Sequence, residues 1–189
     1  MIVAHMISPE IVSRLLAKAT SEKGVFFRSL TADYATQSEV LSLEGSVNSG
    51  GRFNIRNEFG ALYVASDAHI AFDESVYTNQ RTGWLRYKPK TIVGIEFQPL
   101  ATLDLDDERI RSRLGVRESD LSVDYFRKNE SGDIVITQIL GRIAREVGFE
   151  AIRMHSLRGK ATNLAVFLDK VPEWKVKVIH IDRLPNIAF

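Results

Sequence analysis

The chain has 189 residues, 44% apolar and 26% charged, which is enough to bury a core as one globular domain. Its 25 basic and 24 acidic residues give a net charge of +1, which argues against a surface that coats nucleic acid. The absence of cysteine excludes disulfides, thiolate metal sites and cysteine nucleophiles, and it fits a reducing compartment. No apolar run approaches the roughly 20 residues of a membrane span. We therefore expect a cytoplasmic protein that binds neither a membrane nor nucleic acid directly.

The first elements are predicted from capping residues and apolar spacing. Ser8-Pro9-Glu10 is a typical helix start, and the apolar residues that follow at helical spacing predict an amphipathic helix over about 8–22. The apolar segment 25–30 predicts a short strand that carries Arg28 between aromatic and apolar neighbours. Residues 31–50 are polar and end in glycine, so we expect a loop there.

The remaining elements are predicted from the spacing of apolar residues. Strands are predicted at 61–65, 91–97, 102–105, 151–155, 163–168 and 174–181. Helices are predicted at 67–79, 119–128 and 134–147. Because strands and helices do not alternate regularly, this order favours an α+β fold with a compact, mostly antiparallel β core flanked by helices. We expect a single domain over 1–189 with its core at about 25–180. The strand at 174–181 alternates like an edge strand, which is compatible with a homodimer.

The segment Gly50-Gly51-Arg52-Phe53-Asn54 is the first candidate for ligand binding. It lacks the Gly-Lys-Ser/Thr ending of a P-loop and is not a dinucleotide-binding fingerprint. Two glycines still let the backbone approach a ligand closely, and the Arg52 guanidinium can donate two bonds to phosphate oxygens. The alternative is a surface turn with a solvated arginine.

Two other charged residues stand in apolar surroundings. Glu74 lies on the predicted helix 67–79 at the border of its apolar face, so it is either a solvated edge residue or a carboxylate in a cleft. Arg28 lies within a short apolar strand and requires a partner, because an unpaired buried charge is costly. That partner is either a structural salt bridge or a ligand.

Ser156 follows the predicted strand 151–155 directly after His155. Adjacent strand residues point to opposite faces, so His155 is unsuited to act as base on Ser156, and there is no Gly-x-Ser-x-Gly elbow. We expect a hydrogen-bonding serine rather than a nucleophile. The four histidines show no metal-binding spacing, so we expect no metal.

Taken in order, these segments resemble the RES domain family, which is named for an arginine, a glutamate and a serine. The matching segments are Phe27-Arg28, Gly51-Arg52-Phe53-Asn54, Gly60-Ala61-Leu62-Tyr63-Val64-Ala65, Ala71-Phe72-Asp73-Glu74, Thr137-Gln138-Ile139-Leu140-Gly141, and Ser156 followed by Asn163. The resemblance covers about 25–180, and its central block is the most specific part.

The resemblance implies a fold similar to that of ADP-ribosyltransferases. It also implies a bacterial toxin that destroys NAD⁺ by cleaving the nicotinamide–ribose bond, by phosphorolysis or hydrolysis. NAD⁺ is then a substrate, inorganic phosphate is a candidate co-substrate, and no cofactor is needed. The implied partner is an antitoxin protein of the Xre helix-turn-helix type.

The resemblance also implies roles for particular residues. Catalytic roles fall to Arg28, Arg52 and Glu74, and substrate-binding roles to Arg28, Arg52, Tyr63, Ser156 and Asn163. The arginines would grip the pyrophosphate, Tyr63 would form a flat wall for nicotinamide, and Glu74 would stabilise an oxocarbenium-like ribose. Ser156 and Asn163 would hold the nicotinamide ribose or amide. Two alternatives stay open: a mono-ADP-ribosyltransferase that modifies a protein, and a nucleotide-binding module without catalysis.

Overall fold

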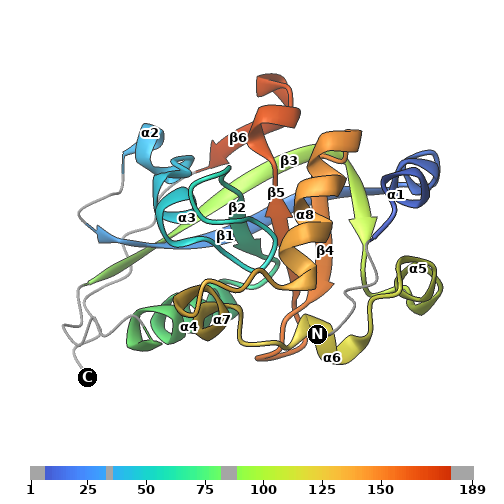
Figure 1. The fold of residues 1–189 in the computed structure, drawn as a ribbon. Helices are drawn as coiled ribbons and strands as arrows, with labels where there is room; N and C mark the ends of the chain where they lie inside the picture. The colour runs from blue at the N-terminus through green and yellow to red at the C-terminus, as the bar shows by residue number, and fades with distance from the viewer. Residues whose placement is uncertain (1–6, 33–35, 82–88, 180–189) are drawn as a thin grey trace.

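The computed structural model describes residues 7–32, 36–81 and 89–179, which form a mixed α+β fold (Figure 1). Its strands are β1 Thr20–Thr31, β2 Leu62–Ala65, β3 Lys90–Asp104, β4 Ala151–His155, β5 Thr162–Val166 and β6 Val176–Ile179. Its α-helices are α1 Pro9–Leu16, α2 Gln37–Val40, α3 Glu44–Ser49, α4 Ala68–Arg81, α5 Glu108–Leu114, α6 Glu118–Leu121, α7 Tyr125–Glu130 and α8 Ile136–Val147. Two 3₁₀ helices, η2 Leu168–Lys170 and η3 Glu173–Lys175, precede β6. The α+β fold class expected from the sequence is confirmed.

The strands pair in the order β1-β2-β5-β4-β3-β6, and β1 also pairs with β3. The five strands β1, β2, β5, β4 and β3 therefore close into a barrel, with β6 added alongside β3. The pairs are antiparallel except β3 with β4, which is parallel. The expectation of a mostly antiparallel core is met by these pairings.

The barrel separates two apolar clusters because successive strand residues point to opposite faces. The inner cluster contains Phe26, Val64, Val93 and Leu164, each at most 4% exposed. The outer cluster contains Leu103, Ile152, Met154 and Ala165, and the apolar faces of α8 and α1 cover it. In Figure 1, α8 lies in front of β4 and α1 lies on the right of the molecule.

Helix α8 also lies against the segment that follows α3. A Cβ atom added to Gly141 would lie 2.6 Å from the carbonyl carbon of Phe53, which is far inside van der Waals contact. One turn earlier on the same helix, Gln138 is fully buried and donates to the carbonyl oxygens of Gly51 and Asn54, at 2.9 and 3.2 Å. The absence of a side chain at Gly141 therefore lets α8 support the backbone of residues 51–54.

Several boundaries differ from those predicted by the sequence. The helix expected at 8–22 ends at Leu16, since Thr20 already pairs with Thr102 in the sheet. The expected loop at 31–50 contains α2 and α3. The region from 106 to 130 holds three short helices, and two of them, α6 and α7, stand where one helix was expected at 119–128. The expected strands at 91–97 and 102–105 are one strand, β3. Residues 180 and 181 of the expected last strand lie outside the described residues.

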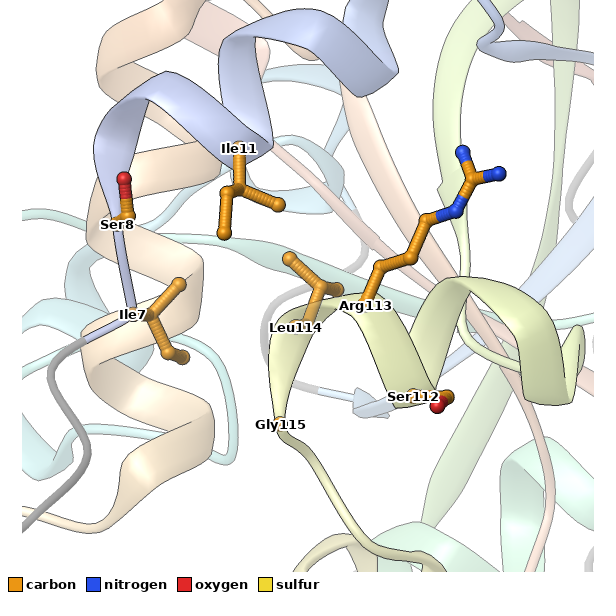
Figure 2. A pocket seen from close by; sticks show the side chains of 7 residues that line it. All are labelled: Ile7, Ser8, Ile11, Ser112, Arg113, Leu114 and Gly115. Atoms are coloured by element: carbon orange, nitrogen blue, oxygen red, sulfur yellow. The ribbon is translucent and has the colours of Figure 1, made fainter.

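A pocket lies between α1 and the end of α5. It is lined by Ile7, Ser8 and Ile11 on one side and by residues 112–115 on the other. Figure 2 shows Ile7, Ile11 and Leu114 around this pocket. In Figure 1, α1 and α5 lie on the right of the molecule and α4 on its left, so the pocket is remote from the helix that carries Glu74.

Among the described helices, none has the length and apolar character to cross a bilayer.

The contact between α8 and Phe53 predicts that Gly141→Ala is strongly destabilising. The added methyl group would force the helix away from the loop, and such overpacking costs about 1–3 kcal/mol or more. Urea unfolding monitored by circular dichroism measures the loss. The matched control is Gly45→Ala in α3, where a Cβ atom meets nothing within 4 Å, so stability should be unchanged or raised. Equal unfolding midpoints for Gly141→Ala and the wild type would contradict this packing.

Candidate functional site

Helix α4 begins where β2 ends, and polar contacts fix its start. The Asp67 carboxylate accepts from the Ile70 backbone N–H at 3.0 Å, as an N-cap does. Ser66 donates its backbone N–H to the carbonyl of Thr162 at 2.8 Å, and its hydroxyl accepts from the Thr162 N–H at 2.9 Å. These bonds tie the start of α4 to the start of β5. Glu74 follows two turns later, above the β4–β5 hairpin.

The structure brings Glu74, Ser156 and Asn163 together. The Oε1 atom of Glu74 accepts from the Ser156 hydroxyl at 2.9 Å and from the Asn163 side-chain amide at 3.1 Å. Ser156 is buried, whereas the Glu74 side chain is 36% exposed. The result is a carboxylate of fixed orientation that a ligand can still reach.

Ser156 is held as a hydrogen-bonding residue. Its hydroxyl accepts from the Arg158 N–H at 3.1 Å while it donates to Glu74, so its proton points at the carboxylate. The His155 ring instead contacts Asp106, with 2.9 Å between Nδ1 and Oδ1. This agrees with the sequence-based expectation that His155 does not serve Ser156 as a base.

Arg158 completes the Glu74 cluster. Its Nε atom lies 3.7 Å from Oε2 of Glu74, and its guanidinium carbon lies 3.6 Å from the centroid of the Tyr77 ring. The cluster therefore pairs the carboxylate with a cation that rests on an aromatic face.

A second group of polar contacts holds the loop around Arg52. The Tyr63 hydroxyl accepts from the Phe53 N–H and donates to Oδ1 of Asn54, both at 2.9 Å. The Asn54 side chain is fully buried and donates to the carbonyls of Ser46 and Phe59. A Cβ atom at Gly51 would lie 2.7 Å from the Tyr63 ring, so contacts within the protein already explain this glycine.

The Arg52 guanidinium projects from this loop toward α6 and α7. It donates to the carbonyl oxygens of Leu121 and Val123, and its central carbon lies 5.4 Å from the Tyr125 ring centroid. The guanidinium therefore links two segments of the fold, unlike the solvated arginine of the alternative interpretation.

The two groups of contacts lie on the same outer face of the barrel. Tyr63 pairs with Ala165, and Ala65 pairs with Asn163, so Tyr63 and Asn163 are diagonal neighbours on adjacent strands. Such neighbours lie about 7–8 Å apart. The loop that Tyr63 holds therefore borders the Glu74 cluster. Burial raises the pKa of the Tyr63 phenol above its ordinary value, so the hydroxyl stays neutral at physiological pH.

Arg28 lies apart from this cluster. It pairs with Val93 on the inner face of β1, whereas the neighbouring Phe27 pairs with Ala65. Its guanidinium donates to the carbonyls of Val40 and Ser42. Desolvation lowers the pKa of Arg28 to about 10, so it remains a cation at neutral pH.

Arg28 and Arg52 share one electrostatic feature. Within the described residues neither forms an ion pair with a carboxylate, since their hydrogen bonds go to backbone carbonyls. Arg145 and Arg153, in contrast, lie against Asp169 and Asp104 at 2.7 and 2.9 Å. The positive charges of Arg28 and Arg52 are thus not neutralised by any carboxylate of the described residues.

Comparison with known proteins matches residues 25–185 to the family described as RES domain. The chain belongs to the RES domain family. The predicted family is thereby confirmed, and the match begins at the boundary expected for the core.

Proteins similar to this RES domain include one relative by sequence and one by structure. A protein of Mycobacterium tuberculosis named probable NAD(+) phosphorylase is 32% identical over 139 residues, which cover 72% of this chain and 63% of that protein. The chain thus matches somewhat less than two thirds of that relative's length. A chain in the crystal structure of the M. tuberculosis MbcT–MbcA toxin–antitoxin complex superposes with a TM-score of 0.72 at 19% identity. That match covers 93% of this chain and 92% of the other, and shows a shared fold.

Sequence reasoning missed three side chains of this RES domain site. Tyr77 and Tyr125 lie within the helices predicted at 67–79 and 119–128, where the apolar spacing does not mark a tyrosine as a site residue. Arg158 lies in a polar segment. Arg158 lies two residues after Ser156 in a turn, and nothing local distinguishes it from a solvated surface arginine. Its position beside Glu74 arises only when the β4–β5 hairpin meets α4.

The Tyr63 contacts predict that Tyr63→Phe lowers the free energy of unfolding by about 1–3 kcal/mol, because two polar groups lose a partner. Chemical denaturation measures that loss. Amide hydrogen exchange should also show faster exchange at Phe53, whose N–H loses its acceptor. Unchanged exchange at Phe53 would contradict the role of Tyr63 in holding the loop.

The raised pKa of Tyr63 adds a pH dependence to the same comparison. The neutral phenol contributes stability that is fully present below the unfolded-state pKa of about 10 and is lost as the pH rises above it. The difference in unfolding free energy between wild type and Tyr63→Phe should therefore shrink above pH 10, by at most about 1.4 kcal/mol per pH unit. A constant difference from pH 8 to pH 11 would be inconsistent with a buried phenol.

Proposed function

We propose that this RES domain cleaves the bond between nicotinamide and ribose in NAD⁺, by phosphorolysis with inorganic phosphate or by hydrolysis with water. The observation that carries the proposal is the accessible Glu74 carboxylate, whose Oε1 atom is held by Ser156 and Asn163. Support also comes from the relative named probable NAD(+) phosphorylase. In its cell the protein acts as the toxin of a toxin–antitoxin pair.

The chemistry of the nicotinamide–ribose bond explains why a single carboxylate can promote its cleavage. Nicotinamide in NAD⁺ is a cationic leaving group, and it takes the electron pair of the C1″–N bond and departs neutral. The ribose left behind develops oxocarbenium character, as in glycoside cleavage. Glu74 stabilises that positive charge, and its two hydrogen bonds hold it in place before the reaction begins.

The pyrophosphate of NAD⁺ requires cations beyond Glu74. Arg52 projects from the loop that borders the cluster. Its hydrogen bonds to described residues go to uncharged carbonyl oxygens, which leave its positive charge available to attract phosphate oxygens. We assign Arg52 to the phosphates and Tyr63 to the wall beside nicotinamide. Arg28 is assigned to the phosphates by family resemblance. Its hydrogen bonds to described residues are made by Nη1 alone, so its other guanidinium nitrogens have donors for a phosphate.

The proposal is tested by incubating purified protein with NAD⁺ in the presence and absence of phosphate. Nicotinamide should be released together with ADP-ribose 1″-phosphate or ADP-ribose, as separated by chromatography. Glu74→Gln should slow the release by about 10²–10³-fold, because the developing charge loses its counter-charge. The control is Glu146→Gln, the same change on an exposed position of α8, which should retain activity.

Two outcomes would contradict the proposal. Folded wild-type protein that leaves NAD⁺ intact under both conditions removes the enzymatic function and favours a nucleotide-binding module. ADP-ribose found by mass spectrometry on a protein, with no free product, would make the site a mono-ADP-ribosyltransferase.

We further propose that the protein's partner is an antitoxin of the Xre helix-turn-helix type. The proposal is supported by the fold shared with a chain of a toxin–antitoxin complex and by the family resemblance. Co-expression with the product of the neighbouring reading frame should yield a stable complex in which nicotinamide release is suppressed. A neighbour that lacks a helix-turn-helix segment, or that does not co-purify, would contradict this partner.

A further inference from the structure

Arg158 places a positive charge at the carboxylate that carries the chemistry. Its Nε atom lies 3.7 Å from Oε2 of Glu74, while Ser156 and Asn163 occupy Oε1. The contact is longer than a hydrogen bond, and the two side chains are 32% and 36% exposed. The pair is therefore loose and open to solvent, and an incoming anion can reach both members.

The orientation of Arg158 is nevertheless restrained. Its guanidinium carbon lies 3.6 Å from the Tyr77 ring centroid, and its backbone N–H donates to the Ser156 hydroxyl at 3.1 Å. Contact with an aromatic face occupies one face of the guanidinium plane and leaves its N–H edges available. The side chain can thus keep its place on Tyr77 while its donors bind other groups.

On the basis of the proposed function, we propose that Arg158 determines the acceptor: it admits inorganic phosphate beside Glu74 and so selects phosphorolysis over hydrolysis. Phosphate carries up to two negative charges at neutral pH, and Glu74 is itself a carboxylate. Two anions this close repel each other, and more strongly near a protein surface than in bulk water, because the effective dielectric constant is lower there. A guanidinium between the two anions offsets that repulsion, since its five donors can serve both.

The reaction balances without a further reagent. The C1″–N bond breaks, and its electron pair neutralises the pyridinium ring of the departing nicotinamide. An unprotonated oxygen of HPO₄²⁻ supplies the electron pair of the new C1″–O bond, which gives ADP-ribose 1″-phosphate. No proton is removed from the acceptor in this step. When water is the acceptor, ADP-ribose forms and one proton is released.

The difference in charge between phosphate and water gives Arg158 and Glu74 different roles. Water is neutral, so it meets no repulsion from Glu74 and gains little from Arg158. Phosphate depends on the cation at every stage of its approach. Arg158 is therefore a specificity residue for the acceptor, whereas Glu74 serves cleavage with either one.

The test compares wild type, Arg158→Gln and Arg158→Lys at several phosphate concentrations. Arg158→Gln should lower kcat/KM for phosphate by about 10- to 100-fold, the range expected when charge-assisted hydrogen bonds are lost. Hydrolysis without phosphate should change by less than about threefold, so the product ratio shifts toward ADP-ribose. Arg158→Lys keeps the charge and should restore part of the phosphorolysis. Lys160→Gln, an equal loss of charge in the same exposed turn, is the control and should leave both rates unchanged.

The possible failures are distinguishable. An equal loss of phosphorolysis and hydrolysis in Arg158→Gln, with an unchanged KM for phosphate, would mean that Arg158 only positions Glu74, and this would overturn the inference. Unchanged kinetics in Arg158→Gln would overturn it as well. A wild-type protein that releases no nicotinamide with either acceptor would instead refute the proposed function itself.

Discussion

The candidate site depends on the pairing of β2 with β5. The pair of Ala65 with Asn163 places the Asn163 side chain on the outer face of the barrel, and the bonds between Ser66 and Thr162 fix the start of α4 beside it. Helix α4 therefore leaves the sheet next to the β4–β5 hairpin, and its second turn brings Glu74 to that hairpin. A shift of one residue in this register would turn Asn163 to the inner face and break its bond to Glu74.

The loop that carries Arg52 is positioned by a different means, namely buried amides that bind backbone groups. Asn54 and Gln138 are both fully buried, and their side-chain amides donate to backbone carbonyls of the loop and of the segments beside it. Gly141 lets α8 approach closely enough for the Gln138 bonds to form. The loop thus has a fixed shape although it is not part of the sheet, and Arg52 can link it to the α6–α7 region without distorting it.

The sequence predicts those features that rest on local signals. A helix with Glu74 at the border of its apolar face is predicted at 67–79, and α4 forms there with Asp67 as its cap. Long-range pairing decides the features that were missed. The sequence predicts two strands at 91–97 and 102–105, yet β3 is continuous. Pro99 lies where the register with β1 shifts, so no ladder bond is required of it. Arg158 was missed for the same reason: its environment is created by α4, which is more than 75 residues earlier in the chain.

The partners of the arginines explain how the fold prepares for an anion. An arginine against a carboxylate, such as Arg145 with Asp169, forms a neutral pair that has little attraction left for phosphate. Arg28 and Arg52 are held by carbonyl oxygens instead, which accept from Nη1 of each guanidinium and leave the net charge in place. The charge of Arg158 is only partly neutralised, because its contact with the Glu74 carboxylate is long and exposed to solvent. Positive charge is thus kept on residues whose positions are already fixed by backbone carbonyls or an aromatic ring. Because these side chains are already ordered, an anionic substrate could bind them without a large loss of side-chain conformational entropy.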